Sequence, residues 1–185
     1  THQPLHIFHP MFWVDRKGNH PAPYTEITLE EFQRKTWQPD PEVARDLNMT
    51  PEALEAYAMH YLRELAGRYP LMIWPYHAML GGIGHALVAA VEEAIFFHSV
   101  ARKTAASLIL KGRHTLTENY SALRPEVVVR EDDQERKLIE QLLAFDALIV
   151  AGQAKSHCVA WTVRDLLSEI HARDASLARK VYLLE

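Results

Sequence analysis

A short apolar strand runs directly into a glycine turn and a helix in ALIVAGQAKSHC, residues 147–158. Cys158, the only cysteine in the sequence, stands at the start of that helix. The positive end of the helix dipole and the unsatisfied backbone N–H groups there favour a thiolate over a thiol. The same N–H groups could hold the oxyanion that forms when a thiolate attacks a carbonyl. Cys158 is therefore a candidate nucleophile, with a small buried packing residue as the alternative interpretation.

Apolar strands alternate with helical segments along the rest of the chain. The periodicity and the breakers predict strands over 71–74, 107–110, 147–150 and 181–184, and helices over 29–36, 51–67, 85–103, 130–143 and 157–172. Strands that are apolar throughout, between helices, are typical of a parallel sheet covered on both faces. We therefore expect one α/β domain over residues 1–185, with residues 14–70 as a long insertion that resembles a lid.

Composition excludes several classes of protein. The 185 residues carry a formal charge of -4, so no basic surplus is present to neutralise phosphates, and we expect no nucleic-acid partner. No apolar run reaches the about 18 residues of a membrane span, and no signal peptide is visible. A single cysteine excludes an intrachain disulfide and suits a reducing compartment. These features predict a cytoplasmic protein without a membrane partner.

The carboxyl ends of the predicted strands carry further candidates, because chemistry in parallel sheets sits there. Lys111 follows the strand 107–110; it could support a thiolate, or it could be a solvated charge at a strand end. His77 follows the strand 71–74, and His2 and His9 crowd the first residues of the chain. Neutral imidazoles are good zinc ligands, although a chain with 11 histidines is expected to show some clustering by chance.

Three segments taken together resemble the isochorismatase-like cysteine hydrolases, and among these the nicotinamidases most of all. They are the nucleophile segment Val150–Val159 with Thr162 and Asp165; Trp74-Pro75-Tyr76-His77 with Gly81 and Gly84; and Leu110-Lys111-Gly112 with Tyr120-Ser121. The segments stand in the family's order and span nearly the whole chain.

The resemblance implies a three-layer α/β/α fold with a central parallel sheet, and an amide hydrolase acting on nicotinamide or a related carboxamide. Cys158 would attack the amide carbonyl, ammonia would leave, and water would hydrolyse the thioester. Lys111 would support the thiolate, and the backbone N–H groups of Ala154 and Cys158 would hold the oxyanion. The family's cis peptide bond would fall between Gln153 and Ala154.

The resemblance also implies a divalent metal, zinc in the first place, with iron or manganese as alternatives. His2 and His77 match the family's two histidine ligands, and His9 is a possible further ligand. Trp74 and Tyr120 would flank the substrate ring, with Trp13 as a third candidate. The partner would be a small-molecule amide, and a homo-oligomer is expected.

The family's catalytic Asp and its metal-binding Asp would both lie upstream of Thr1. We therefore expect this chain to lack its first strand, and also its C-terminal end.

Two departures leave the substrate open. Ala78 stands where the family often has Cys, and Gly82-Ile83 where it often has Thr-Pro. One alternative is a superfamily hydrolase that acts on a carbamoyl compound or on isochorismate, although isochorismatases do not use the cysteine. Another is a non-catalytic module that kept the fold.

Overall fold

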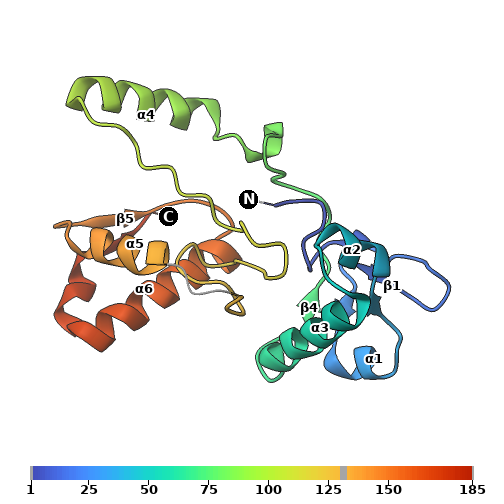
Figure 1. Cartoon of the computed structure of the whole chain (residues 1–185). Coiled ribbons are helices and arrows are strands. Elements are labelled where there is room, and N and C mark those ends of the chain that lie inside the picture. Colours follow the sequence, from blue (N-terminus) through green and yellow to red (C-terminus); the bar gives the residue numbers. More distant parts are fainter. Residues whose placement is uncertain (1, 130–132, 185) are drawn as a thin grey trace. The chain divides into compact units, whose positions relative to one another are not determined.

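A computed structural model describes residues 2–129 and 133–184; for residues 133–136 the description covers the backbone alone. The chain divides into two compact units, Thr1–Thr115 and Leu116–Glu185. Each unit has its own set of helices and its own short strands (Figure 1). The sequence predicted one domain over residues 1–185, whereas the structure has two compact units.

Over its described residues, 2–115, unit 1 is built from short strands, two 3-10 helices and four α-helices, of which α3 is the longest. Its elements are η1 (Pro10–Phe12), β1 (Trp13–Val14), β2 (Glu26–Ile27), α1 (Leu29–Gln33), β3 (Gln38–Pro39), α2 (Pro41–Asp46), α3 (Pro51–Leu65), β4 (Leu71–Met72), η2 (Ile83–His85) and α4 (Ala89–Arg102). β1 pairs with β3 and β2 pairs with β4, both antiparallel.

The core of unit 1 comes mainly from the segment that the sequence predicted to be a lid-like insertion. α3 contacts both α1 and α2 and buries the helically spaced Leu54, Tyr61 and Leu65. Trp13 and Phe32 are almost fully buried beside it. Residues 14–70 therefore supply the hydrophobic interior of this unit, which is the main source of its stability.

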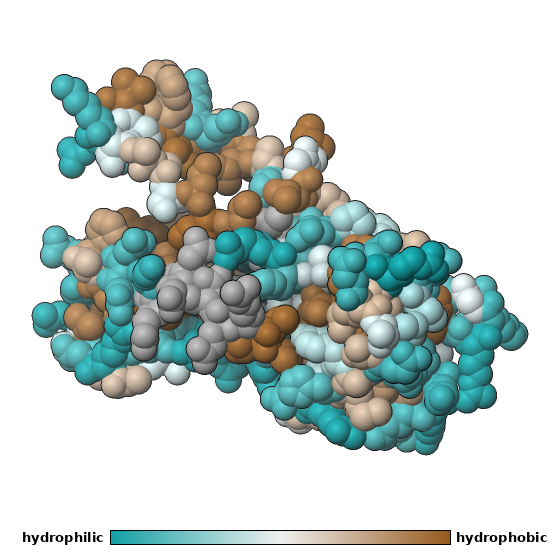
Figure 2. Space-filling view, viewed as in Figure 1, coloured by the Kyte–Doolittle hydropathy of each residue, from teal (hydrophilic) through white to brown (hydrophobic). Residues whose placement is uncertain are grey.

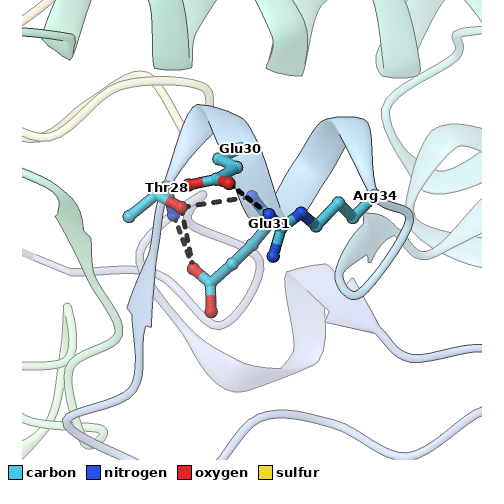
Figure 3. A network of polar contacts seen from close by, with 4 residues as sticks. All are labelled: Thr28, Glu30, Glu31 and Arg34. Carbon is cyan, nitrogen blue, oxygen red and sulfur yellow. Dashed lines mark hydrogen bonds and ion pairs between the residues drawn. The ribbon is translucent and has the colours of Figure 1, made fainter.

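Side-chain caps fix where the helices of unit 1 begin. At α1, Thr28 Oγ1 accepts from the Glu31 N–H at 3.2 Å, and the Thr28 N–H donates to Glu31 Oε2 at 2.9 Å, which together form a capping box (Figure 3). At α3, Thr50 Oγ1 accepts from the Ala53 N–H at 3.2 Å. Both helix starts were predicted correctly because such caps are purely local in sequence.

Unit 2 contains a parallel pair of strands and two longer helices. Its elements are α5 (Asp133–Leu143), β5 (Leu148–Val150), η3 (Lys155–Val159, a π-helical turn), α6 (Ala160–Arg173), η4 (Ala175–Lys180) and β6 (Val181–Leu183). The core consists of buried aliphatic side chains from four parts of the unit: Leu123, Ile139, Leu148, Leu166 and Ile170. Residues 130–132, where the sequence predicted the start of a helix, lie outside the described residues.

The predicted three-layer fold with a central parallel sheet is wrong for this structure. In the described part of the chain, the strands are two or three residues long and form three separate two-stranded sheets. β5 and β6 do pair in parallel, as their apolar runs predicted. The run 107–110 forms no strand, and its Leu108 is 82% exposed. An apolar run predicts burial, but pairing with a distant strand is a non-local event that the run itself does not encode.

Unlike the other α-helices, α4 has no buried residue. Large apolar side chains on it are exposed, among them Phe96, Phe97 and Val100 at about 60% each. Hydrophobic residues are accordingly visible at the surface of this segment (Figure 2). None of the helices in the described ranges has the length and apolar character that crossing a membrane requires.

The capping box gives a direct test of the fold of unit 1. We expect Thr28→Ala to lower the free energy of unfolding by about 1 kcal/mol, because it leaves the Glu31 N–H without its acceptor. Urea unfolding followed by tryptophan fluorescence measures the change. Thr36→Ala, at an exposed position just after α1, is the control and should change stability by less than about 0.5 kcal/mol. Equal losses in the two variants would contradict the assigned cap.

Candidate functional site

The residues around Cys158 form what we call the nucleophile turn, residues 152–159 between β5 and α6. The strand ends at Val150, Gly152 has a φ of 144°, and the Gln153–Ala154 peptide bond is cis, as the resemblance indicated. The Ala154 carbonyl then accepts from the N–H groups of His157 and Val159, both at 3.1 Å. Cys158 therefore lies in a π-helical turn that leads into α6, with its side chain partly exposed. Turns of this kind are frequent at functional sites.

Aromatic rings gather beside Cys158. The ring of Tyr120, which the sequence predicted to contact substrate, lies 5.7 Å from the ring of His157. It also lies 6.5 Å from the indole of Trp161, with only 21° between the two planes. The structure therefore brings Tyr120 to the nucleophile turn although 38 positions separate it from Cys158. Trp161 was missed by the sequence reasoning, although its spacing of three residues from Cys158 puts both on neighbouring helical positions.

Thr162 connects the Tyr120 loop to the nucleophile turn. Its Oγ1 donates to the Cys158 carbonyl at 2.7 Å and accepts from the Ala122 N–H at 2.9 Å. One hydroxyl thus satisfies two backbone groups from distant parts of unit 2. In the sequence, Thr162 belongs to the nucleophile segment but nothing there reveals this role, because the bond to the Ala122 N–H joins positions that are 40 residues apart.

Unit 1 contains a histidine cluster made of His2, His6, His9 and His77. The ring centroid of His2 lies 4.2 Å from that of His77, 5.3 Å from that of His9 and 5.9 Å from that of His6. The backbone brings the two ends of the cluster together, since the His2 N–H donates to the Ala78 carbonyl and the Leu80 N–H donates to the His2 carbonyl. The three predicted metal ligands are therefore neighbours.

Burial keeps most of this cluster neutral. Desolvation lowers the pKa of His2 to about 2, with the neighbouring His77 as the next cause. Desolvation also lowers the pKa of His6 and of His9 to about 4 each. At neutral pH these imidazoles are therefore uncharged, which is the form that binds a metal ion.

Hydrogen bonds to backbone carbonyls set the ring tautomers of two cluster members. His9 Nδ1 donates to the Trp74 carbonyl at 3.1 Å, and His77 Nδ1 donates to the Pro75 carbonyl at 2.6 Å. Each ring therefore keeps its lone pair on Nε2, in the arrangement that metal-binding histidines usually show. His9 Nε2 and His2 Nδ1 are buried without a hydrogen-bond partner. Such unsatisfied nitrogens fit the chemistry of a cation ligand.

The donor set fits a divalent metal, but the side chains do not converge on one point. Among the described residues, no group of three or more His, Cys, Asp or Glu is placed to hold a metal ion. Binding through His2, His9 and His77 would require their rings to turn until the lone pairs meet.

His6 has a structural role that the sequence did not reveal. It is fully buried; its Nδ1 accepts from the Gln3 N–H at 3.2 Å, and its Nε2 donates to the Gly112 carbonyl at 3.1 Å. The half-buried Lys111, the predicted thiolate-supporting residue, directly precedes that carbonyl. The ring of His6 therefore holds the segment after Lys111 against the first residues of the chain.

The two tryptophans predicted to contact substrate have different surroundings. Trp74 borders the histidine cluster, because its carbonyl accepts from His9 and its ring centroid lies 6.4 Å from that of His77. Trp13 is fully buried, and its indole N–H donates to the Ile7 carbonyl at 2.5 Å. Trp13 is thus a core residue of unit 1 with no face for a ligand, and we do not retain it as a substrate contact.

Comparison of the chain with family models, with curated proteins and with solved structures finds no match. Support for a function of this chain therefore comes from the nucleophile turn, from the histidine cluster and from the motif resemblance.

The buried state of His6 predicts how stability depends on pH. The folded pKa of about 4 lies below the ordinary 6.5, so between these values the unfolded chain binds the proton more readily. The free energy of unfolding should therefore fall as pH is lowered from 6.5 towards 4, and be insensitive to this group above 6.5. We expect His6→Gln to show a smaller acid-induced loss than the parent, measured by urea unfolding at several pH values.

The control for this experiment is His60→Gln on α3, because its side chain is 55% exposed. It should retain the pH dependence of the parent. If His6→Gln also retained it, the assignment of the acid-sensitive step to the buried His6 ring would be wrong.

Proposed function

We propose that this protein is a cysteine-dependent amide hydrolase that converts nicotinamide or a related carboxamide to the carboxylate and ammonia. The observation that carries the proposal is the placement of Cys158 in a turn between a parallel strand and a helix, with Tyr120 and Trp161 beside it. A nucleophile close to a helix start, next to aromatic rings, can attack a carbonyl that a flat substrate presents.

The proposed reaction has two halves. The Cys158 thiolate forms a C–S bond to the amide carbon, the C–N bond breaks, and the leaving nitrogen departs as ammonia after taking up a proton. Water then attacks the thioester carbon, the C–S bond breaks, and a carboxylate and the thiolate are released. Across both halves one water is consumed for each amide, so no oxidant or reductant is required.

The roles of Lys111 and of the backbone N–H groups of Ala154 and Cys158 stay predictions from the resemblance. A positive charge from Lys111 would favour the thiolate, and the two N–H groups would stabilise negative charge on the carbonyl oxygen. An unpaired catalytic thiol also persists best in a reducing compartment, which supports a cytoplasmic location as part of the proposal.

The histidine cluster supports a metal site as a second element of the proposal. His2, His9 and His77 would hold a zinc ion, with iron or manganese as alternatives. His2 and His9 each offer a neutral, buried nitrogen without a hydrogen-bond partner, and the His77 ring neighbours both. A bound cation would supply a positive charge that orients and polarises a ligand atom. The protein's contribution is to keep the His2 and His9 rings neutral by burial and to direct Nδ1 of His9 and of His77 at backbone carbonyls.

Ammonia release from nicotinamide tests the proposed hydrolysis. We expect the parent protein to release ammonia, and Cys158→Ala to reduce the rate by at least about 1000-fold, because the covalent step is lost. Since Cys158 is the only thiol, one equivalent of iodoacetamide should inactivate the parent, and nicotinamide should slow that inactivation. Ser156→Ala, a change two residues away that spares the thiol, is the matched control.

Two results would count against this function. Activity that survives in Cys158→Ala would exclude the cysteine as nucleophile. A parent protein that hydrolyses neither nicotinamide nor other amides would leave a carbamoyl compound, isochorismate or a non-catalytic role as the remaining readings.

Metal content tests the histidine cluster separately from turnover. We expect protein prepared with zinc to retain about one ion per chain by elemental analysis, and His9→Ala and His77→Ala each to lower zinc affinity at least about tenfold. The control is His20→Ala, whose exposed ring lies outside the cluster and donates to the Trp13 carbonyl. Unchanged zinc content in both cluster variants would remove the metal site from the proposal.

A further inference from the structure

A polar pocket of about 390 Å³ in unit 1 is surrounded mostly by basic side chains. It lies between the loop that follows β1 and the end of α1, and it is lined by Asp15, Arg16, Lys17, Arg34, Lys35 and Thr36. Four of these six residues are cationic at neutral pH, whereas the chain as a whole carries a formal charge of -4. The positive charge is therefore concentrated locally, and neither the nucleophile turn nor the histidine cluster uses it.

Arg16 joins the two walls of this basic pocket. Its Nη2 donates to the Arg34 carbonyl at 2.8 Å, and its Nε donates to the Lys35 carbonyl at 3.3 Å. These carbonyls lie at the C-terminal end of α1, where the helix dipole is negative and would repel an anion. Because the guanidinium group covers both carbonyls with positive charge, an anion can be accommodated at this end of the helix.

The Asp15 carboxylate, which also lines the basic pocket, is already bonded within its own loop. Its Oδ1 accepts from the backbone N–H groups of Lys17 and Asn19 at 2.7 and 2.8 Å. Its Oδ2 accepts from the Asn19 side-chain amide at 3.0 Å. Three N–H donors thus satisfy this carboxylate, which reduces its competition with a ligand for the surrounding cations.

The cations of the pocket differ in their existing partners. Arg34 forms an exposed ion pair with Glu30, with 2.5 Å between Nη2 and Oε1 (Figure 3). Lys35 is exposed and has no carboxylate partner within the described ranges. The Lys35 ammonium group is therefore available to a ligand, whereas Arg34 is shared with a neighbouring acid.

The backbone at Lys35 is one that glycine or asparagine adopts more readily than lysine. Its φ is 57°, in the left-handed region. The Lys35 N–H donates to the Phe32 carbonyl at 2.9 Å and the Thr36 N–H donates to the Glu31 carbonyl at 2.9 Å, which is the pattern of a Schellman end. A cation thus stands at a position where it costs stability, and such strain is often retained where a side chain binds a ligand.

We propose that this basic pocket binds the phosphate groups of a small soluble molecule, with Arg16, Lys17 and Lys35 as the main contacts. Guanidinium and ammonium groups form strong charge-assisted hydrogen bonds to phosphate oxygens. A pocket of about 390 Å³ has the size of a small-molecule site. Binding here is independent of the reaction proposed at Cys158, and pyrophosphate is the simplest probe because it carries several negative charges on a compact frame.

Calorimetry on the full chain, in a buffer without divalent cations, tests the basic pocket directly. We expect pyrophosphate to bind saturably in the millimolar range or more tightly. Raising NaCl from about 0.05 M to about 0.5 M should weaken binding at least about fivefold, because salt screens exposed charges. Lys35→Asn should also weaken binding about fivefold, since one charge about 4 Å from the anion is lost, while asparagine tolerates the left-handed backbone.

Lys103→Asn is the matched control. Lys103 is likewise an exposed lysine directly after a helix, with a left-handed φ of 53°, but it lies outside the basic pocket. This change should leave the affinity for pyrophosphate as it is in the parent. Glu30→Gln is the second variant: it frees Arg34 from its ion pair and should tighten binding about twofold or more. A gain in affinity cannot arise from a loss of folding.

The results distinguish a built site from a general response to charge. A loss in Lys35→Asn and a gain in Glu30→Gln, with Lys103→Asn unchanged, would support the pocket. Equal losses in Lys35→Asn and Lys103→Asn, or a parent that does not bind pyrophosphate saturably, would overturn it. Co-sedimentation with phosphatidylglycerol vesicles tests a lipid as the source of the phosphate, and binding to vesicles without binding to pyrophosphate would overturn the assignment to a small soluble molecule.

Discussion

The imidazole of His6 is the constraint on which the arrangement of unit 1 around its histidines depends. A buried ring that bonds to backbone groups at positions 3 and 112 ties together segments that are far apart in the sequence. The neighbouring Ile7 N–H donates to the Thr115 carbonyl at 2.8 Å and strengthens the same junction. The Gln3 N–H and the Gly112 carbonyl bond to this buried ring. Removing the ring would leave both groups without that hydrogen-bond partner, which would lower the free energy of unfolding.

Unit 2 contains a similar arrangement, in which the single side chain of Thr162 bonds to two backbone groups. A single hydroxyl satisfies the Ala122 N–H and reaches the Cys158 carbonyl. Nearby, Arg124 forms an ion pair with Glu169 of α6, and Arg173 lies 3.6 Å from the other oxygen of that carboxylate. Each unit thus fixes its candidate functional segment by side-chain to backbone bonds rather than by a long strand ladder. Such bonds position a segment to within a fraction of an ångström when both partners are ordered.

Local signals were read correctly from the sequence and non-local ones were not. The starts of α1 and α3, the span of α3 and the apolar runs of β5 and β6 are encoded within a few residues of where they lie. The prediction of a central sheet was wrong because strand pairing depends on residues that are distant in the sequence. The run 107–110 has the apolar composition of a buried strand, but its side chains are exposed.

In the candidate site, too, some features were predicted from the sequence and others were not. The neighbourhood of His2, His9 and His77 was predicted from strand ends and the family resemblance, and so was the cis bond before Ala154. Trp13 was assigned to a ligand because its chemistry suits an aromatic substrate, but its burial follows from packing that the sequence does not display. The role of His6 was missed because an imidazole that bonds to two backbone groups leaves no spacing pattern.

The exposed character of α4 has a consequence for the dynamics of the chain. Fourteen residues of helix without a buried side chain gain little from packing, and isolated helices of about 12 to 15 residues are marginal in water. The helix is therefore stabilised mainly by its own backbone hydrogen bonds and by its C-cap residue Lys103, whose backbone has the left-handed conformation. Its amide protons should exchange with solvent through local fraying, long before the cores around Leu54 and Ile170 open.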